Sequence, residues 1–183
     1  IMLMKVYLWF RKNILKIDDR SQLEIAIENG LKIGKNHNIQ DQVILDWSHC
    51  WLIEIGDNVT IAPRVYILCH DASTKNTLGY TKIGRVRIGN NVFIGTGSII
   101  LYDTKIGSNV IVAAGSIITK DVPDNVVVAG IPAKVIGTFD TFLDKRIQET
   151  YLQYVDVSPT YYCMVDANAE WEKFYLKRGN LDD

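Results

Sequence analysis

Residues 88–118 read IGNNVFIGTGSIILYDTKIGSNVIVAAGSII, and this stretch repeats with a period of six. An aliphatic side chain returns at every sixth position, at Ile88, Ile94, Ile100, Ile106, Val112 and Ile118. Neither an α-helix nor an alternating strand has this period. The same step occurs upstream, at Ile55, Ile61 and Ile67, and before them at Ile33, Ile39 and Leu45.

Small residues follow these aliphatic anchors, as at Gly56, Ala62, Gly89, Gly95 and Ala113. A six-residue unit can form one short strand and one sharp corner, so three units can close a triangular coil. Successive coils would stack at about 4.8 Å through backbone hydrogen bonds. Each coil buries its apolar side only against its neighbours, which predicts an all-β solenoid.

Helical patterns flank the solenoid. Ser21 and Glu24 form a capping box, and Gly30 can end that helix in the left-handed conformation. We therefore expect three parts: an N-terminal helical cap over residues 1–32, the solenoid over residues 33–137 with a loop excursion at 71–82, and a C-terminal helical extension over residues 138–183.

Amphipathic stripes lie within both flanks. The stripe at residues 3–17 is basic on its other side, so it can cover the end of the core or make peripheral contact with an anionic membrane surface. Further helical stripes at residues 139–154 and 168–178 can cover the other end or contact other subunits.

Composition narrows the class of protein. The chain of 183 residues carries 20 Lys plus Arg against 21 Asp plus Glu, which gives no electrostatic indication of nucleic-acid binding. The three cysteines form no complete disulfide set, so we expect a reducing, cytoplasmic location. No apolar run reaches the roughly 20 residues that a membrane-spanning helix needs.

The repeat frame breaks after His70. Residues 71–82 are polar and lack the anchors, which predicts a loop that leaves the coil. Loops on a rigid scaffold often carry binding groups. His70 stands at the root of this loop and is therefore a candidate functional residue.

The repeat resembles that of the hexapeptide-repeat acyltransferases, most closely the maltose, galactoside and surface-polysaccharide O-acetyltransferase branch. The matching motifs are IGDNVTIAP (55–63), the segment around His70, IGNNVFIG (88–95), AAGSIITKDVP (113–123) and AGIPAKVI (129–136). This resemblance implies a left-handed parallel β-helix, a homotrimer, and transfer of the acetyl group of acetyl-coenzyme A to a hydroxyl of a sugar or surface-glycan precursor. It implies no metal.

The resemblance also implies roles for particular residues. His70 matches the general base that removes the acceptor's proton, which suits an imidazole. A backbone N–H near Gly95 and Thr96 would stabilise the oxyanion. Coenzyme contacts are expected at Gly95, Thr96, Ala114, Thr119, Lys120, Gly130, Pro132 and Lys134. Cys69 adjoins His70, but an extended chain turns the two side chains apart, so we interpret Cys69 as a packing residue.

Two departures from the family concern the turns and the acceptor. Tyr102 and Asp103 stand where many relatives carry Pro-Gly, and Cys50 stands near the position of the Asp that holds a galactoside. A different acceptor site is therefore expected, lined by Asp46, Trp47, His49, Trp51 and Asp71. The tryptophans can equally cap the first coils, and sequence alone leaves both interpretations open.

Other functions fit the same scaffold. Some similar β-helices are carbonic anhydrases, which need three His around zinc, and the spacings of 12 and 21 between His37, His49 and His70 argue against that arrangement. Transfer to the amine of a nucleotide-linked amino sugar stays possible, because an amine can use the same donor and base. A noncatalytic scaffold would leave the coenzyme motifs unexplained.

Overall fold

The computed structural model describes residues 21–155, and of residues 148–155 only the backbone. The chain divides into two units, residues 1–137 and residues 138–183, and each is described by itself. The second unit contains the helix α4 (Phe139–Val155). The expected stripe at residues 3–17 and the expected helix at 168–178 lie outside the described residues. Within residues 21–155, no helix has the length and apolar character to cross a bilayer.

The first unit is built mainly from very short strands. In chain order its elements are α2 (Gln22–Glu28), β1 (Lys32–Ile33), β2 (Asn38–Ile39), β3 (Ile44–Leu45), the 3-10 turn η1 (Cys50–Leu52), β4 (Ile53–Ile55), β5 (Thr60–Ile61), β6 (Tyr66–Ile67), β7 (His70–Asp71), α3 (Lys75–Leu78), β8 (Lys82–Ile83), β9 (Val86–Ile88), β10 (Val92–Ile94), β11 (Ile99–Ile100), β12 (Thr104–Ile106), β13 (Val110–Val112), β14 (Ile117–Ile118), β15 (Val126–Gly130) and β16 (Ala133–Thr138).

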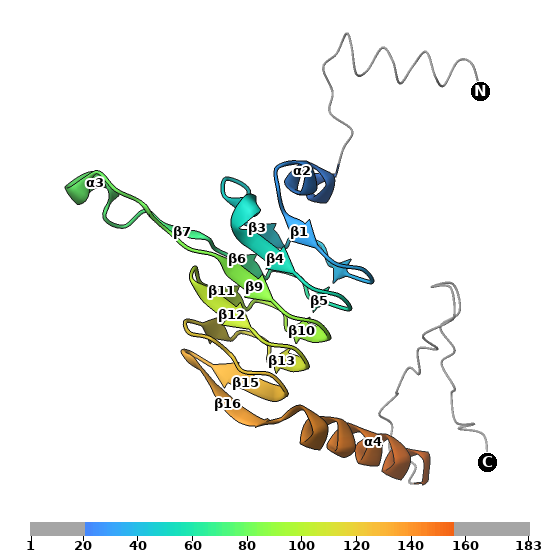
Figure 1. The fold of residues 1–183 in the computed structure, drawn as a ribbon. Helices are drawn as coiled ribbons and strands as arrows, with labels where there is room; N and C mark the ends of the chain where they lie inside the picture. The colour runs from blue at the N-terminus through green and yellow to red at the C-terminus, as the bar shows by residue number, and fades with distance from the viewer. Residues whose placement is uncertain (1–20, 156–183) are drawn as a thin grey trace, which may run out of the picture. The chain divides into compact units, whose positions relative to one another are not determined.

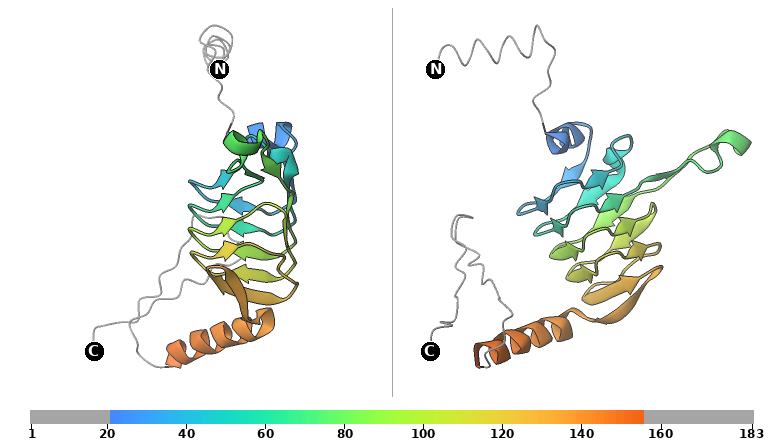
Figure 2. Two further views of the ribbon diagram at one scale, coloured as in Figure 1. Left: turned by 90° about the vertical axis from the view of Figure 1, so that its left-hand side faces the viewer. Right: turned by 180° about the vertical axis from the view of Figure 1, so that it is seen from behind.

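Three sheets wind around a common core (Figures 1 and 2). The first sheet holds β1, β4, β9 and β12, the second β2, β5, β10, β13, β15 and β16, and the third β3, β6, β11 and β14. The chain visits the three sheets in turn, and strands of successive coils pair in parallel. The predicted three-sided solenoid is therefore confirmed.

The aliphatic anchors fill the core in register. Ile61 pairs with Ile94 and Ile94 with Val112, and all three side chains are fully buried. The compact residues between the anchors are also buried, including Val59, Val65, Val92, Ser98, Val110 and Ser116. Apolar burial along this column is the main force that holds the coils together.

We call the turn between the first and second sheets the asparagine corner. In each coil it contains an Asn with positive φ, namely Asn36, Asn58, Asn91, Asn109 and Asn125, with φ between 53° and 62°. Their side-chain amides bond from one coil to the next at 3.1, 2.9, 3.0 and 2.8 Å. Asn tolerates the left-handed region better than most residues, which explains this repeated choice.

The second corner lies between the second and third sheets. Its positive-φ residues are Gln42, Arg64, Gly97 and Gly115. Close stacking occurs here as well, because a Cβ placed on Gly95 would lie 2.5 Å from the Ala114 nitrogen. This corner is regular in length but varied in residue type.

The third turn, which we call the open corner, is irregular. Its passages are residues 46–52, 68–85, 101–103 and 119–121. The first passage includes η1, so the anchors Leu45 and Ile55 on its two sides are ten residues apart and not six. The second passage sends out an arm, residues 72–81, through the antiparallel pair β7 and β8 (Figure 1). The Gly84 N–H donates to the Cys69 carbonyl at 2.9 Å and closes this excursion, so the coil resumes.

The helix α2 begins with the expected capping box. The Glu24 N–H donates to Ser21 Oγ at 3.2 Å, and the Ser21 N–H donates to the Glu24 carboxylate at 2.7 Å. Ala26 of this helix is buried in the core cluster. The Cys50 thiol donates to the Ala26 carbonyl at 3.6 Å, which ties α2 to the first passage of the open corner.

Candidate active site

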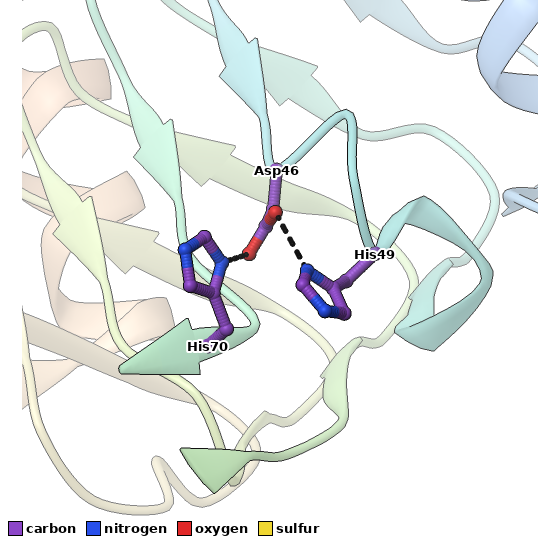
Figure 3. A group of neighbouring side chains, drawn as sticks. All are labelled: Asp46, His49 and His70. Atoms are coloured by element: carbon purple, nitrogen blue, oxygen red, sulfur yellow. Dashed lines mark hydrogen bonds and ion pairs between the residues drawn. The ribbon is translucent and has the colours of Figure 1, made fainter. Parts of the chain in front are cut away.

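The side chains of Asp46, His49 and His70 meet at the open corner (Figure 3). Asp46 directly follows β3, and His70 comes three residues after the end of β6. These two strands pair in parallel with Leu45 opposite Ile67, so the residues that follow them leave the third sheet side by side. The stacking of coils thus joins groups that are 24 residues apart in the chain.

The Asp46 carboxylate is the centre of the cluster. Its Oδ2 accepts from His70 Nδ1 at 2.5 Å and from the Cys69 N–H at 2.7 Å. Its Oδ1 accepts from Ser48 Oγ at 2.9 Å and lies 3.3 Å from His49 Nδ1. Every contact that the carboxylate makes here is with a donor, which favours its ionised form.

The charge of Asp46 decides the chemistry of His70. The Asp46 residue is only 5% exposed. Burial raises the pKa of its carboxyl, but the hydrogen bonds from His70, Cys69, Ser48 and His49 outweigh burial and lower the pKa from its ordinary value. An ionised carboxylate can only accept, so we assign the proton of the neutral His70 ring to Nδ1. Nε2 then carries a lone pair, which is what a general base requires.

Cys69 lies beside this cluster but is not a nucleophile. Its side chain is fully buried, and burial together with the charge of Asp46 raises the pKa of the thiol to about 12. A thiol with this pKa is protonated at neutral pH and reacts slowly. Its burial confirms the interpretation of Cys69 as a packing residue.

Asp71 makes hydrogen bonds at the root of the arm. One carboxylate oxygen accepts from the Ser73 N–H at 2.8 Å, and the other accepts from the Tyr102 hydroxyl at 3.2 Å. The Ser73 N–H is the main reason that the pKa of Asp71 is lowered. Lys82 lies over the Tyr102 ring, 4.7 Å from its centroid. These contacts hold the root of the arm to the next coil, and the expected place of Asp71 in the acceptor site stays a prediction.

The two tryptophans remain accessible. Trp47 is 37% exposed and Trp51 is 51% exposed. The Trp51 ring lies 5.2 Å from the His49 ring, centroid to centroid. Trp51 also backs onto Gly30, where an added Cβ would lie 3.0 Å from the Trp51 Cβ. Trp51 thus combines contact with the end of α2 and an open ring surface beside the cluster.

The residues predicted for the oxyanion lie at the second corner. The Gly95 N–H is already committed to the Val112 carbonyl at 2.8 Å. Thr96 bonds through its hydroxyl to the Pro63 carbonyl at 2.7 Å, and among residues 21–155 its N–H makes no hydrogen bond. Of the two amides, only that of Thr96 is free for a ligand.

The other predicted coenzyme residues are spread over three places. Ala114 lies at the second corner with Gly95 and Thr96, whereas Thr119 and Lys120 lie in the last passage of the open corner. The remaining three follow the coils, around the connection from β15 to β16: Gly130, Pro132 and Lys134. Since the second corner and the open corner are different edges of the prism, one chain does not bring Thr96 together with His70.

The same cluster is the one group of three potential metal ligands found in the described part of the chain, with ligand atoms within 4.8 Å of one another. The spacing of the His residues gave no indication that His49 and His70 would meet with ring centroids 4.8 Å apart. The third member is a carboxylate, so the three-His zinc arrangement is not formed. Both rings direct Nδ1 at Asp46, which is the pattern of a hydrogen-bonded network.

Comparison with known proteins finds the same repeat. Residues 85–120 match the family model for the bacterial transferase hexapeptide, six repeats. Protein CapG of Staphylococcus aureus is 49% identical over 105 residues, which cover 55% of this chain and 61% of CapG. A maltose O-acetyltransferase structure from Clostridium difficile 630 is 31% identical, with a TM-score of 0.51 over 75% of this chain and 84% of that chain.

A second solved structure contains the donor molecule. It is a hexapeptide-repeat containing acetyltransferase from Vibrio cholerae O1 biovar eltor, complexed with acetyl-coenzyme A. It is 29% identical, with a TM-score of 0.53, over 60% of this chain and 61% of that chain.

The matches cover different shares of the related proteins. The chain spans 54% to 61% of the length of the curated relatives it matches, but most of the length of the maltose O-acetyltransferase. The hexapeptide repeat of these structures implies that the coil is left-handed. The chain therefore belongs to the hexapeptide-repeat acyltransferases, in the branch of the maltose, galactoside and surface-polysaccharide O-acetyltransferases.

Proposed function

We propose that the protein transfers the acetyl group of acetyl-coenzyme A to a hydroxyl of a sugar or surface-glycan precursor, with His70 as general base. The observation that carries this proposal is the bond of 2.5 Å between His70 Nδ1 and the buried Asp46 carboxylate. It supports a ring that carries its proton on Nδ1 and is held in one orientation, and in the described part of the chain Nε2 has no hydrogen-bond partner. The His70 side chain is 34% exposed, so a substrate can reach it.

Proton movement through His70 balances the reaction. His70 Nε2 accepts the proton of the acceptor hydroxyl as the hydroxyl oxygen bonds to the thioester carbonyl carbon. The carbon–sulfur bond then breaks, and Nε2 returns the proton to the departing thiolate of the coenzyme. Between these steps the imidazolium is stabilised by the negative charge of Asp46, whose contact with Nδ1 is retained throughout.

The donor is expected to use residues outside the cluster. The free N–H of Thr96 suits the oxyanion that forms on the thioester carbonyl. Lys120 and Lys134 are exposed and can meet the phosphates of the coenzyme, and the exposed Gly130 permits close approach of its backbone. Together with Ala114, Thr119 and Pro132, these residues remain the proposed coenzyme contacts.

A homotrimer would complete the site. Because Thr96 and His70 belong to different corners of one prism, a reaction centre that uses both needs the second corner of one copy beside the open corner of another. This placement supports the proposed trimer, with the coenzyme between neighbouring subunits. We also place the reaction in the cytoplasm. Peripheral membrane contact by residues 3–17 falls outside the described residues.

The acceptor is proposed to lie against Trp47, His49 and Trp51. Exposed indole faces suit the C–H surface of a sugar ring. Asp46 and Asp71 are less available to the acceptor than expected, since their carboxylates are occupied by donors of the protein itself.

Thiol release from acetyl-coenzyme A, measured against a panel of sugars and amino sugars, tests the proposal. We expect sugar-dependent release that falls about 10²- to 10⁴-fold in His70→Ala, because a general base contributes that much. The matched control is His37→Ala, whose ring is at the asparagine corner and, among residues 21–155, bonds only to the Gly34 carbonyl. Equal rates in the native protein and His70→Ala would refute the base role. Faster turnover of amino sugars would favour N-acetylation, and no release together with no coenzyme binding would favour a noncatalytic scaffold.

A further inference from the structure

The hydrogen-bond network also fixes the proton of His49. Ser48 has one hydroxyl hydrogen, which it donates to Asp46 Oδ1 at 2.9 Å. Ser48 Oγ also lies 2.9 Å from His49 Nδ1, so the hydrogen of that second contact must come from the ring. The neutral His49 is therefore protonated at Nδ1 and carries its lone pair on Nε2.

Two imidazoles thus present unused acceptor atoms at the open corner. His49 and His70 both direct Nδ1 at the same carboxylate, one to each oxygen (Figure 3). Their side chains are 23% and 34% exposed. Among the described residues, none bonds to Nε2 of either ring. The general base needs only one such atom, so the second is available for another task.

The Asp46 carboxylate does not need His49 as a hydrogen-bond donor. The contact from His49 Nδ1 to Asp46 Oδ1, at 3.3 Å, is the longest of the four that the carboxylate makes. Ser48 already holds Oδ1, while Cys69 and His70 hold Oδ2. The carboxylate would remain satisfied on both oxygens without His49.

The His49 ring lies close to two other rings. The His49 centroid lies 5.2 Å from that of Trp51 and 4.8 Å from that of His70. His49 thus lies near both the exposed indole and the imidazole proposed as the base. An acceptor ring that rests on Trp51 and presents a hydroxyl to His70 also comes within reach of His49.

We infer that His49 is a specificity residue whose Nε2 accepts a hydrogen bond from a second hydroxyl of the acceptor. The acceptor is then a polyhydroxylated ring that is held at two hydroxyls, one by each imidazole, and not a simple alcohol. This inference rests on the proposed function. It adds the atom that distinguishes a sugar from a mono-alcohol at this site.

Two substitutions separate the two nitrogens of His49. Asn in His49→Asn keeps an N–H near the position of Nδ1 and lacks the ring tip. Gln in His49→Gln reaches the ring tip with an amide oxygen and lacks the Nδ1 position. The acceptors are methyl glucoside, methyl galactoside, their mono-deoxy derivatives and n-propanol, and the readouts are kcat and KM for acceptor and for acetyl-coenzyme A.

We expect His49→Asn to raise the acceptor KM about tenfold, the loss of one hydrogen bond, with kcat and the KM for acetyl-coenzyme A unchanged. His49→Gln should recover part of this loss. The rise in acceptor KM caused by His49→Asn should disappear with the deoxy derivative that lacks the bound hydroxyl. The native protein should use n-propanol poorly as an acceptor.

Different failures have different meanings. A lower kcat in His49→Gln with normal kinetics in His49→Asn would show that Nδ1 positions Asp46, and would overturn the inference. The inference would also be overturned if His49→Asn raised the acceptor KM equally for every deoxy derivative while His70-dependent turnover persisted. If no sugar raised thiol release above the acceptor-free rate, the proposed function itself would fail, and this inference with it.

Discussion

The asparagine corner and the open corner both border the first sheet but are built in opposite ways. At the asparagine corner every coil uses the same residue in the same conformation, and each side-chain amide bonds to its copy in the next coil. At the open corner the passages differ in length and residue type, and Asp46 bonds to side chains and backbone of unlike kinds.

This difference separates stability from chemistry. A ladder of identical amides uses its polar groups on one another, so it fixes the coil spacing and offers a ligand little. The cluster at Asp46 combines a buried charge with two imidazoles that each keep one nitrogen unused. Irregularity at one edge is what allows unlike groups to meet, while repetition at the other edge keeps the scaffold rigid.

The largest effect is expected from Asp46→Asn. The Asn side chain has a similar shape but can donate to His70 Nδ1, which would move the ring proton to Nε2 and remove the base. We expect kcat to fall about 10³-fold, within the range of a lost general base. The unfolding midpoint should fall as well, because the amide nitrogen that donates to His70 also faces the buried Cys69 N–H, which loses its acceptor. Steady-state kinetics and urea unfolding measure the two effects. Unchanged kcat would mean that Asp46 does not set the His70 tautomer.

The asparagine corner should respond in the reverse manner. Asn91→Ala loses the ladder bonds to Asn58 and Asn109 and places a Cβ-bearing residue at φ 55° without a compensating amide. We expect about 2 kcal/mol of destabilisation by urea unfolding, with kcat unchanged.

Asn91→Gly is the matched control, because Gly adopts positive φ without strain. It should lose only about 1 kcal/mol. Equal losses in the two variants would show that backbone conformation contributes nothing at this corner. A fall in kcat in either variant would show that the two corners are not independent.

The smallest effect is expected at the root of the arm. Tyr102→Phe removes the hydrogen bond of 3.2 Å to Asp71 and keeps the ring under Lys82. We expect about 0.5 to 1.5 kcal/mol of local destabilisation, seen as faster hydrogen exchange in residues 70–83 and unchanged exchange in the asparagine corner. Faster exchange throughout the coils would indicate a global role for Tyr102.

Much of the fold could be predicted from the sequence, because each coil buries the same kind of side chain at the same step along the chain. The aliphatic anchors from Ile88 to Ile118 predict a buried column of side chains. The absence of anchors after His70 predicts the loop at residues 71–82. The capping box at Ser21 is equally local. Each of these features depends on residues that are neighbours in the chain or separated by a fixed step.

The candidate site was less predictable, because it depends on register across an irregular corner. The partnership of Asp46 with His70 requires that Leu45 stack on Ile67, and the extra residues of η1 hide that alignment from a six-residue frame. Aligning the anchors on either side of η1 would have placed Asp46 beside the root of the loop. The commitment of Asp71 to Ser73 and Tyr102 has no comparable signal, because Tyr102 comes from the next coil.

The arm leaves and re-enters the stack through a pair in which His70 faces Ile83, and Gly84 closes the gap to Cys69. The coils on either side therefore stack as if an ordinary short turn connected them. Exchange of residues 72–81 for a segment of another length would leave the β7–β8 pair and the Gly84–Cys69 hydrogen bond in place. Natural or engineered changes in this segment can therefore alter which molecules reach the His70 imidazole while the coils stay the same.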